Sequence, residues 1–375
     1  MINVVLEKEA RKIVRIYANS KYPCEQKGNI IYDSQIIPNL GFAEEMPKKL
    51  ECLYALVAFR PSHIFLSRDV LGGKPIYYDS MGISSFKNLL EKPRGVLPGE
   101  IVKLDYSGEI IEKRRFFLSE VIKKEDLSYE EAKERILKSL SRIRFKNACI
   151  AFSGGLDSSL LASLHDLPLI SVTANKEEKN WILESAKKIS REVEILNIVE
   201  KEIISVTPNV VKIIEDNNFL QLSVAVPLYL LFDFAKKLGF SEIILGQGAD
   251  ELFGGYKRYE KIEYEELETI LLKELSEIGD KNLVRDFKLS YATEMKLILP
   301  YLTWDVIRAA ISVPAREKIK EIDGCKVRKY FLRDIASNFL PEEIVWREKK
   351  AIQYSTGVAK ILKKWFSQTT RVHGF

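Results

Sequence analysis

Between residues 147 and 246, short apolar segments alternate with longer amphipathic ones, and this alternation restricts the fold more than any other feature. The short segments have the length and β-branched content of buried strands, while the longer ones have helical spacing. Strands that alternate with helices form a parallel sheet with helices on both faces. We therefore expect a doubly wound α/β domain whose strands lie at 147–152, 168–174, 194–199 and 242–246.

The pattern differs on either side of this region. About the first 115 residues contain β-rich runs separated by glycine and proline turns, which predicts a β-rich domain over residues 1–120. Ser128 has the spacing of a helix cap, and it opens an amphipathic segment at 128–143. The α/β domain is expected to occupy residues 125–375, and after Glu260 the pattern is helical to the end. A chain of 375 residues is long enough for two such domains.

Composition narrows the class of protein. Hydrophobic residues make up 46% and charged residues 30%, as in soluble globular proteins. The net charge of +5 comes without a basic run, so nucleic acid is not expected as a partner. We find no apolar stretch of the ~18 residues that a membrane span needs, and no signal peptide. The four cysteines are widely spaced, which argues against a zinc site and favours a reducing, cytoplasmic location.

The sequence SGGLDSS at 153–159 leaves an expected strand and enters an expected helix. Ligands bind at such turns in doubly wound sheets. Gly154 and Gly155 would let backbone N–H groups approach an anion, and Ser153 and Ser158 add hydroxyl donors. Asp157 would repel a phosphate unless a cation lay between them, and Mg²⁺ is the cation that carboxylates and phosphates share. The alternative is an ordinary turn in which Asp157 caps the helix.

A second glycine-rich turn, GQGADELFGGY at 246–256, follows another expected strand. Its position would bring Asp250 and Glu251 to the same edge of the sheet as Asp157, where a cation could be shared. An acidic helix start is the simpler interpretation of ADEL taken alone.

These segments resemble known families. SGGLDSS resembles the pyrophosphate loop of the N-type ATP pyrophosphatases, which adenylate a substrate and release pyrophosphate. The second turn resembles the G-x-G-(S/A)-D-E-x-F-G-G-Y signature of the asparagine synthetases and β-lactam synthetases. Residues 329–358 resemble the K-x-x-L-R, L-P and R-x-K segment of the same families. The resemblance implies ATP and Mg²⁺ as cofactors and a small carboxylate and ammonia or an amine as substrates.

The resemblance also assigns roles to individual residues. Lys349 would neutralise charge on the adenylate and pyrophosphate, and Gln247 would face the attacking amine. Asp157 and Asp250 would bind the metal. ATP and pyrophosphate would be bound by Ala151, Ser153, Gly154, Gly155, Asp157, Ser158, Leu245, Gly246 and Arg347. The REKK context of Lys349 also fits a solvated surface.

The N-terminal part resembles, more faintly, a glutamine amidotransferase domain of the N-terminal-nucleophile type, on residues 55–80 and 96–104. That domain uses a cysteine at position 2, which is Ile2 here, and the first cysteine is Cys24. We therefore expect a shortened domain without glutaminase activity, so that free ammonia, another amine or a separate amidase supplies the nitrogen. A second copy of the chain is the other partner left open.

Two departures concern the synthetase site. The asparagine enzymes have glutamate where this chain has Gln247, and an amide cannot act as a general base. The acceptor segment E-x-R-x-P-F-L-D appears as KLILPYLT at 296–303, where Lys296, Ile298 and Thr303 replace its charged members. The main hypothesis is an AMP-forming asparagine synthetase that does not use glutamine. The alternatives are an amide or lactam synthetase with another acceptor, and a non-catalytic ATP-binding partner of another synthetase.

Overall fold

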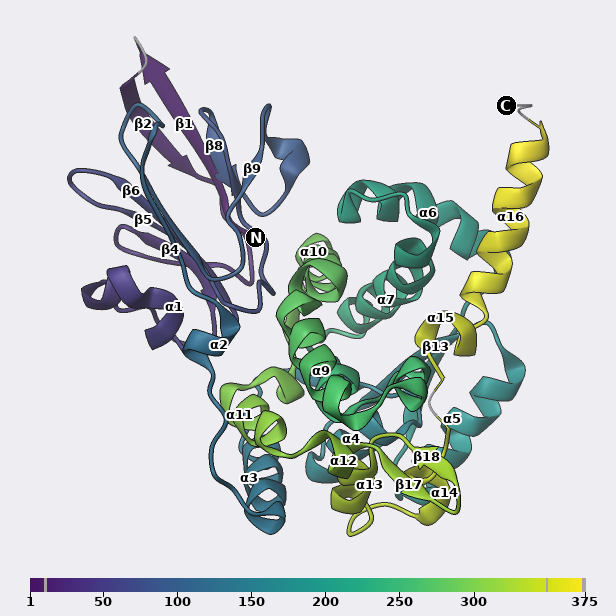
Figure 1. Cartoon of the computed structure of the whole chain (residues 1–375). Helices are drawn as coiled ribbons and strands as arrows, with labels where there is room; N and C mark the ends of the chain where they lie inside the picture. The colour runs from purple at the N-terminus through teal and green to yellow at the C-terminus, as the bar shows by residue number, and fades with distance from the viewer. Residues whose placement is uncertain (10–11, 349, 373–375) are drawn as a thin grey trace.

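A five-stranded parallel sheet lies at the centre of the C-terminal part of the chain (Figure 1). The computed structural model describes residues 1–9, 12–348 and 350–372. The strand order across this sheet is β14-β13-β12-β15-β16, and every neighbouring pair is parallel. The strands are β12 (Ala148–Ala151), β13 (Leu169–Thr173), β14 (Val193–Asn197), β15 (Glu242–Ile244) and β16 (Lys296–Ile298).

The strand order reverses between β12 and β15. The chain moves from β12 outward through β13 and β14, and then returns to β15 and β16 on the other side. Loops that follow the two central strands lead in opposite directions, which opens a crevice for ligands at their carboxyl ends. The two motifs at 153–159 and 246–256 are those loops. The predicted doubly wound sheet is confirmed, and its topology brings the two motifs together.

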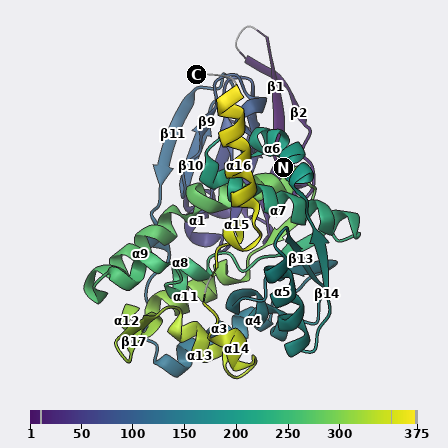
Figure 2. The same ribbon diagram turned by 90° about the vertical axis from the view of Figure 1, so that its right-hand side faces the viewer.

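Helices surround this sheet (Figures 1 and 2). Ser128 caps α3 as predicted, since its hydroxyl accepts from the Glu131 N–H and the Glu131 carboxylate accepts from the Ser128 N–H. The helices are α3 (Tyr129–Ser141), α4 (Leu156–Leu164), α5 (Lys176–Lys188), α6 (Glu200–Ile214), α7 (Phe219–Lys237), α8 (Ala249–Phe253), α9 (Tyr264–Ile278), α10 (Val284–Ala292), α11 (Trp304–Ser312), α12 (Ala315–Lys318), α13 (Tyr330–Ala336), α14 (Glu342–Val345), α15 (Ile352–Ser355) and α16 (Val358–Val372).

The N-terminal part forms two antiparallel sheets, as the β-rich pattern predicted. One has the order β2-β1-β8-β7-β9 and the other the order β11-β10-β6-β5-β4-β3. Their strands are β1 (Asn3–Glu9), β2 (Lys12–Ala18), β3 (Glu25–Lys27), β4 (Ile30–Ser34), β5 (Tyr54–Phe59), β6 (Ile64–Arg68), β7 (Tyr77–Tyr78), β8 (Gly82–Ser84), β9 (Arg94–Gly95), β10 (Glu100–Leu104) and β11 (Ile110–Arg115), with short helices α1 (Met46–Lys49) and α2 (Leu118–Val121) beside them. A separate apolar cluster, which includes Ile2, Leu66 and Val102, fills their interior.

The N-terminal sheets pack directly on α10 and on the π-helical turn at 279–283. The Tyr291 hydroxyl of α10 donates to the buried Asp33 carboxylate at 2.6 Å, and the Lys74 ammonium pairs with the same carboxylate. Gly279 lies so close to the N-terminal backbone that a Cβ there would be 2.1 Å from the Leu71 carbonyl oxygen. The boundary that the sequence predicts between residues 120 and 125 falls at the end of α2 and before α3, but the main apolar core continues across it.

Three sequence expectations were wrong. The segment after Glu260 is not helical throughout, because β16 joins the sheet and β17 (Lys320–Ile322) pairs with β18 (Cys325–Val327). Helix α4 begins at Leu156 with Gly155 at its cap position, so the alternative in which Asp157 caps this helix is wrong. An apolar helix of sufficient length for a membrane span does exist in the described chain: α7 passes by length and composition, with a mean hydropathy of 1.4. Its most apolar stretch is 56% buried, and α7 packs on α6, α10 and β13, as a core helix does.

The buried Lys318 generates a prediction about stability. Lys318 is 4% exposed, and burial, with a smaller effect of the Lys124 charge, lowers its pKa from 10.5 to about 7. Between these values the unfolded chain binds more protons than the folded one, so this group makes stability rise with pH from about 7 to 10 and contributes least below pH 7. We expect Lys318→Met to be more stable at pH 7, by on the order of 1 kcal/mol or more, and to lose that part of the rise. Urea unfolding at pH 7, 8 and 9 measures both effects, and equal slopes in the two proteins would contradict the prediction.

Candidate active site

The loop after β12 forms a cradle at the amino end of α4. Gly154 has a left-handed backbone with φ of +64°, and a Cβ there would lie 2.8 Å from Ser185 Oγ. The Trp181 indole N–H donates to the Gly154 carbonyl at 2.9 Å, which fixes the loop against α5. Gly155 occupies the cap position of α4, so the first N–H groups of the helix face the loop. Backbone donors gathered at a helix start form an anion site.

The two serines of this loop lie together. Ser153 Oγ is 3.1 Å from Ser158 Oγ, and it also accepts from the Gly155 N–H at 3.3 Å. Ser153 is exposed, whereas Ser158 is buried and holds the turn by donating to the Gly155 carbonyl. The Ser153 hydroxyl is therefore the one available to an anion. Ala151, at the end of β12, is half-buried and precedes this cradle.

The loop after β15 contacts the loop after β12. Gly246 is so close to Asp157 that an added Cβ would lie 2.9 Å from Asp157 Cβ. Gly248 has a left-handed backbone with φ of +93° and precedes α8, whose first turn carries Asp250. Leu245 is buried, and its N–H donates to the Ile298 carbonyl of β16. Gln247 is half-buried between Gly246 and Gly248.

Asp157 and Asp250 are brought to one cation, which is the Lys329 ammonium. Lys329 Nζ donates to both carboxylate oxygens of Asp157, at 2.6 and 2.7 Å, and lies 2.7 Å from Asp250 Oδ1. The two carboxylates are thus close enough to share a cation, as their positions in the sequence predicted. Lys329 is the site residue that the sequence analysis missed, although it begins the K-x-x-L-R match.

Gly255 provides the space for this arrangement. A Cβ at Gly255 would lie 1.9 Å from Asp250 Oδ1 and 2.4 Å from Lys329 Cε. The next acidic residue, Glu251, is buried and does not join the pair. It accepts from the Tyr256 hydroxyl at 2.6 Å and from the Asn282 amide at 3.1 Å. Burial, followed by the nearby Asp250 charge, raises the pKa of Glu251.

Arg347 joins the C-terminal segment to the cradle. Its guanidinium makes two 3.0 Å contacts with the buried Glu178 carboxylate, stacks 4.2 Å above the Trp181 ring, and lies 3.4 Å from the Ser153 carbonyl oxygen. Arg333 supports this segment by donating to the carbonyl groups of Val345 and Arg347. Arg347 therefore lies beside the loop, and Glu178 is a second residue that the sequence did not indicate. Lys349 lies outside the described residues.

The acceptor segment at 296–303 does not present a charge to the site. Lys296 pairs with Glu242 at 3.2 Å, and both residues begin their strands, at the edge opposite the loops. The expectation that Lys296 replaces a pocket residue was therefore wrong, because its position in β16 directs it elsewhere. Thr303 caps α11 and lies 3.2 Å from Ser139 Oγ. Tyr301 does contact the site, since its hydroxyl donates to the Asp157 carbonyl at 3.0 Å.

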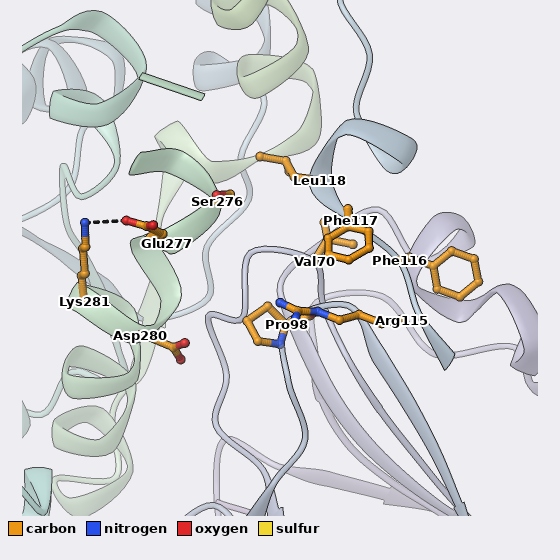
Figure 3. A pocket seen from close by; sticks show the side chains of 10 residues that line it. All are labelled: Val70, Pro98, Arg115, Phe116, Phe117, Leu118, Ser276, Glu277, Asp280 and Lys281. Atoms are coloured by element: carbon orange, nitrogen blue, oxygen red, sulfur yellow. Dashed lines mark hydrogen bonds and ion pairs between the residues drawn. The ribbon is translucent and has the colours of Figure 1, made fainter. Parts of the chain in front are cut away.

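A cavity of about 440 Å³ lies elsewhere, between the N-terminal sheets and α9 (Figure 3). Its charged groups have partners: Glu277 and Lys281 pair at 2.6 Å, Asp280 lies 3.6 Å from Arg68, and Arg115 donates to the Pro98 carbonyl. No part of it is formed by the two loops, so the chemistry is assigned to the switch point and not to this cavity.

Mg²⁺ fits the donors that the loops provide. In the described part of the chain, no three metal-binding side chains converge, so Asp157 and Asp250 are the protein's two carboxylates for this position. Mg²⁺ is commonly held by one or two carboxylates, with waters and substrate phosphates completing its octahedron. The cradle at 153–158 would place those phosphates next to the pair.

Whether the site needs a residue without a Cβ at position 255 can be tested directly. We expect Gly255→Ala to weaken binding of a magnesium complex of an ATP analogue by about 10-fold or more, because the methyl group must displace Asp250 or Lys329. Isothermal titration calorimetry measures the affinity. Gly95→Ala is the matched control, since a Cβ there meets only the Tyr77 ring at 3.6 Å. Unchanged affinity in a Gly255→Ala protein would contradict the described geometry.

Comparison with known proteins identifies the family of this chain. A family model described as asparagine synthase matches residues 142–270 and 262–372. A Methanocaldococcus jannaschii protein named as a glutamine-hydrolysing asparagine synthetase is 32% identical, over 92% of this chain and 76% of its own length. The glutamine-hydrolysing asparagine synthetase of Gallus gallus is 26% identical, over 90% of this chain and 69% of its own length.

Among solved structures, the NMN synthetase from Francisella tularensis is similar to 64% of this chain, and the match covers 87% of its own chain. The sequence identity is 12% and the TM-score is 0.32, so this similarity is too distant to inform function. The family match covers both switch-point loops and the C-terminal segment that carries Lys329 and Arg347. This chain belongs to the asparagine synthase family and is an ATP-dependent, asparagine synthetase-like ligase.

Proposed function

We propose that this ligase forms asparagine from aspartate, Mg²⁺-ATP and free ammonia, and releases AMP and pyrophosphate. The observation that carries the proposal is the meeting of Asp157 and Asp250 at one cation position beside the phosphate cradle. The names of the relatives support aspartate as the acceptor. The cytoplasmic location, the two-domain division and any amidase or homodimer partner stay predictions from the sequence.

In the first half-reaction, the acceptor carboxylate is adenylated, and different residues would bind and orient different parts of the nucleotide. The cradle at 153–158 would hold the β- and γ-phosphates, and Asp157 and Asp250 would orient them through Mg²⁺, which supplies charge neutralisation when bound. The α-phosphate is then open to attack by the acceptor carboxylate, giving an acyl-adenylate and pyrophosphate. Lys349 would stabilise the charge that develops on the departing pyrophosphate. Arg347, held by Glu178, would keep the C-terminal segment in place over the loop.

Two side chains of the N-terminal part support our proposal for the nitrogen source. Ile2 is fully buried, at 0% exposure, and its side chain offers no nucleophile. Burial raises the pKa of the Cys24 thiol to about 12, so Cys24 does not supply a thiolate near neutral pH. These observations support free ammonia rather than glutamine as the donor.

A ligase for another acceptor is the second candidate. The segment at 298–303 contributes Ile298 and Leu302 near the loops, and a Cβ at Gly248 would lie 2.4 Å from Leu302. Gln247 also departs from the glutamate of the asparagine enzymes. Both features favour an acceptor other than aspartate.

One assay separates these candidates. Pyrophosphate and AMP release from ATP is measured with aspartate, glutamate, β-amino acids and larger carboxylic acids, each with ammonium or with glutamine. We expect aspartate with ammonium to give asparagine, and glutamine to replace ammonium poorly. Asp157→Asn and Asp250→Asn should each lower the rate by ~10²-fold or more, whereas Asp233→Asn, which removes a pair with Lys237 on α7, should not. Turnover only with another acid would establish the second candidate.

Gln247 generates a prediction about pH. Attack on the adenylate needs neutral ammonia, and the Gln247 amide cannot remove a proton from ammonium. Product formation should therefore rise steeply between pH 7 and 9 at a fixed total ammonium concentration. Gln247→Glu should flatten that rise by supplying a carboxylate base, and should leave the adenylation step almost unchanged.

The measurement is asparagine formation at saturating aspartate across this pH range, with adenylation followed separately by pyrophosphate exchange. Gln247→Met is the control that removes the amide without adding a base. A pH profile that is the same in wild type and Gln247→Glu would show that the proton leaves by another route.

A further inference from the structure

The Lys329 side chain occupies the position between the two carboxylates that a metal would take. Its ammonium contacts three carboxylate oxygens within 2.7 Å, two from Asp157 and one from Asp250. The side chain is 2% exposed, so this charge is removed from solvent. A buried ammonium is stable only with such compensation.

The surrounding residues hold the Lys329 backbone so that its ammonium points to the two carboxylates. Lys329 has a left-handed backbone with φ of +56°, a conformation that is uncommon for residues other than glycine. The preceding Arg328 is fixed, because its guanidinium donates to the Gly255 carbonyl at 2.7 Å and its carbonyl accepts from Arg333 Nε at 2.8 Å. Gly255, in turn, has no Cβ to meet Lys329 Cε. Arg328, Arg333 and Gly255 therefore direct the Lys329 ammonium to the two carboxylates.

A cation at this position has a consequence for metal binding. A divalent ion that binds Asp157 and Asp250 must approach the Lys329 charge closely, and like charges repel strongly where solvent is excluded. The described residues offer the ion only these two carboxylates. ATP changes this balance, since its phosphate oxygens provide further ligands for the metal and a new partner for the ammonium.

We propose that Lys329 is an internal counter-cation that holds Asp157 and Asp250 together before nucleotide binds and makes metal binding depend on nucleotide. This inference rests on the proposed role of the two carboxylates as metal ligands. It accounts for the strained backbone at Lys329, because a mobile lysine would not compete with a divalent ion.

The test measures metal binding without turnover. Mn²⁺ is titrated into the whole chain and its free concentration is followed by electron paramagnetic resonance, with and without AMPCPP, an ATP analogue that cannot be cleaved between the α- and β-phosphates. Wild type should bind Mn²⁺ weakly alone and tightly with AMPCPP. Lys329→Met should bind Mn²⁺ alone at least ~10-fold more tightly than wild type, because a unit charge next to the ion has been removed.

Two further variants complete the experiment. Lys329→Arg keeps the charge and should keep weak binding without nucleotide. Lys326→Met removes a lysine from the adjacent strand β18, where it donates to the Ile262 carbonyl, and should behave as wild type. If Lys329→Met is unstable, the midpoint of its thermal unfolding is measured instead. Mn²⁺ should raise this midpoint more than it raises that of wild type, and NaCl should raise it less than Mn²⁺ does.

The outcomes distinguish this inference from the proposed function. If wild type binds Mn²⁺ with AMPCPP but Lys329→Met gains no affinity without it, the counter-cation role is overturned and the metal ligands stand. If Mn²⁺ fails to bind wild type even with AMPCPP, the assignment of Asp157 and Asp250 as metal ligands is overturned, and the inference with it.

Discussion

The close contact between the loops that follow β12 and β15 is the constraint on which the rest of the site depends. The strand order reverses at these two strands, so their loops leave the sheet in opposite directions. They can still touch because Gly246 has no Cβ to meet Asp157. This contact brings Asp157 and Asp250 to a single ammonium, and it places the cradle at 153–158 beside them.

The C-terminal segment adds two further side chains to the site formed by the sheet loops. Lys329 enters the site from the residue before α13, and Arg347 reaches the loop through Glu178 and Trp181. Arg333 connects these two positions, since it donates to the Arg328 carbonyl and to the Arg347 carbonyl. One buried guanidinium therefore couples the placement of the lysine to that of the segment that covers the loop. The site is assembled from three parts of the chain that are distant in sequence.

The N-terminal sheets are joined to the synthetase part by buried contacts. Asp33, Lys74 and Tyr291 form a buried polar contact across the boundary, and the main apolar core includes residues of both parts. Breaking a buried ion pair of this kind leaves an uncompensated charge, which is strongly unfavourable. Asn282, in the turn that packs on these sheets, bonds Glu251 next to Asp250. The N-terminal part thus supports the synthetase helices that border the site.

Much of this could be predicted from local pattern. Four of the five strands of the parallel sheet lie where the apolar runs placed them, because buried parallel strands need short, continuous apolar segments. Strand β16 was missed because three residues in the apolar run 296–303 have no period that distinguishes a strand from a helix. Lys296 was misassigned for a related reason, since its direction depends on where β16 begins.

By itself the sequence determined the two loops and the chemistry of their residues, because glycine spacing and carboxylate positions are local properties. It could not determine which cation joins those carboxylates. Lys329 is 172 residues from Asp157, and Arg347 is 169 residues from Glu178, so only the folded chain decides these pairings. A lysine beside a hydrophobic helix looks like a surface residue in the sequence. Only the tertiary structure buries the Lys329 side chain between the two carboxylates, and this burial fixes the position of its charge.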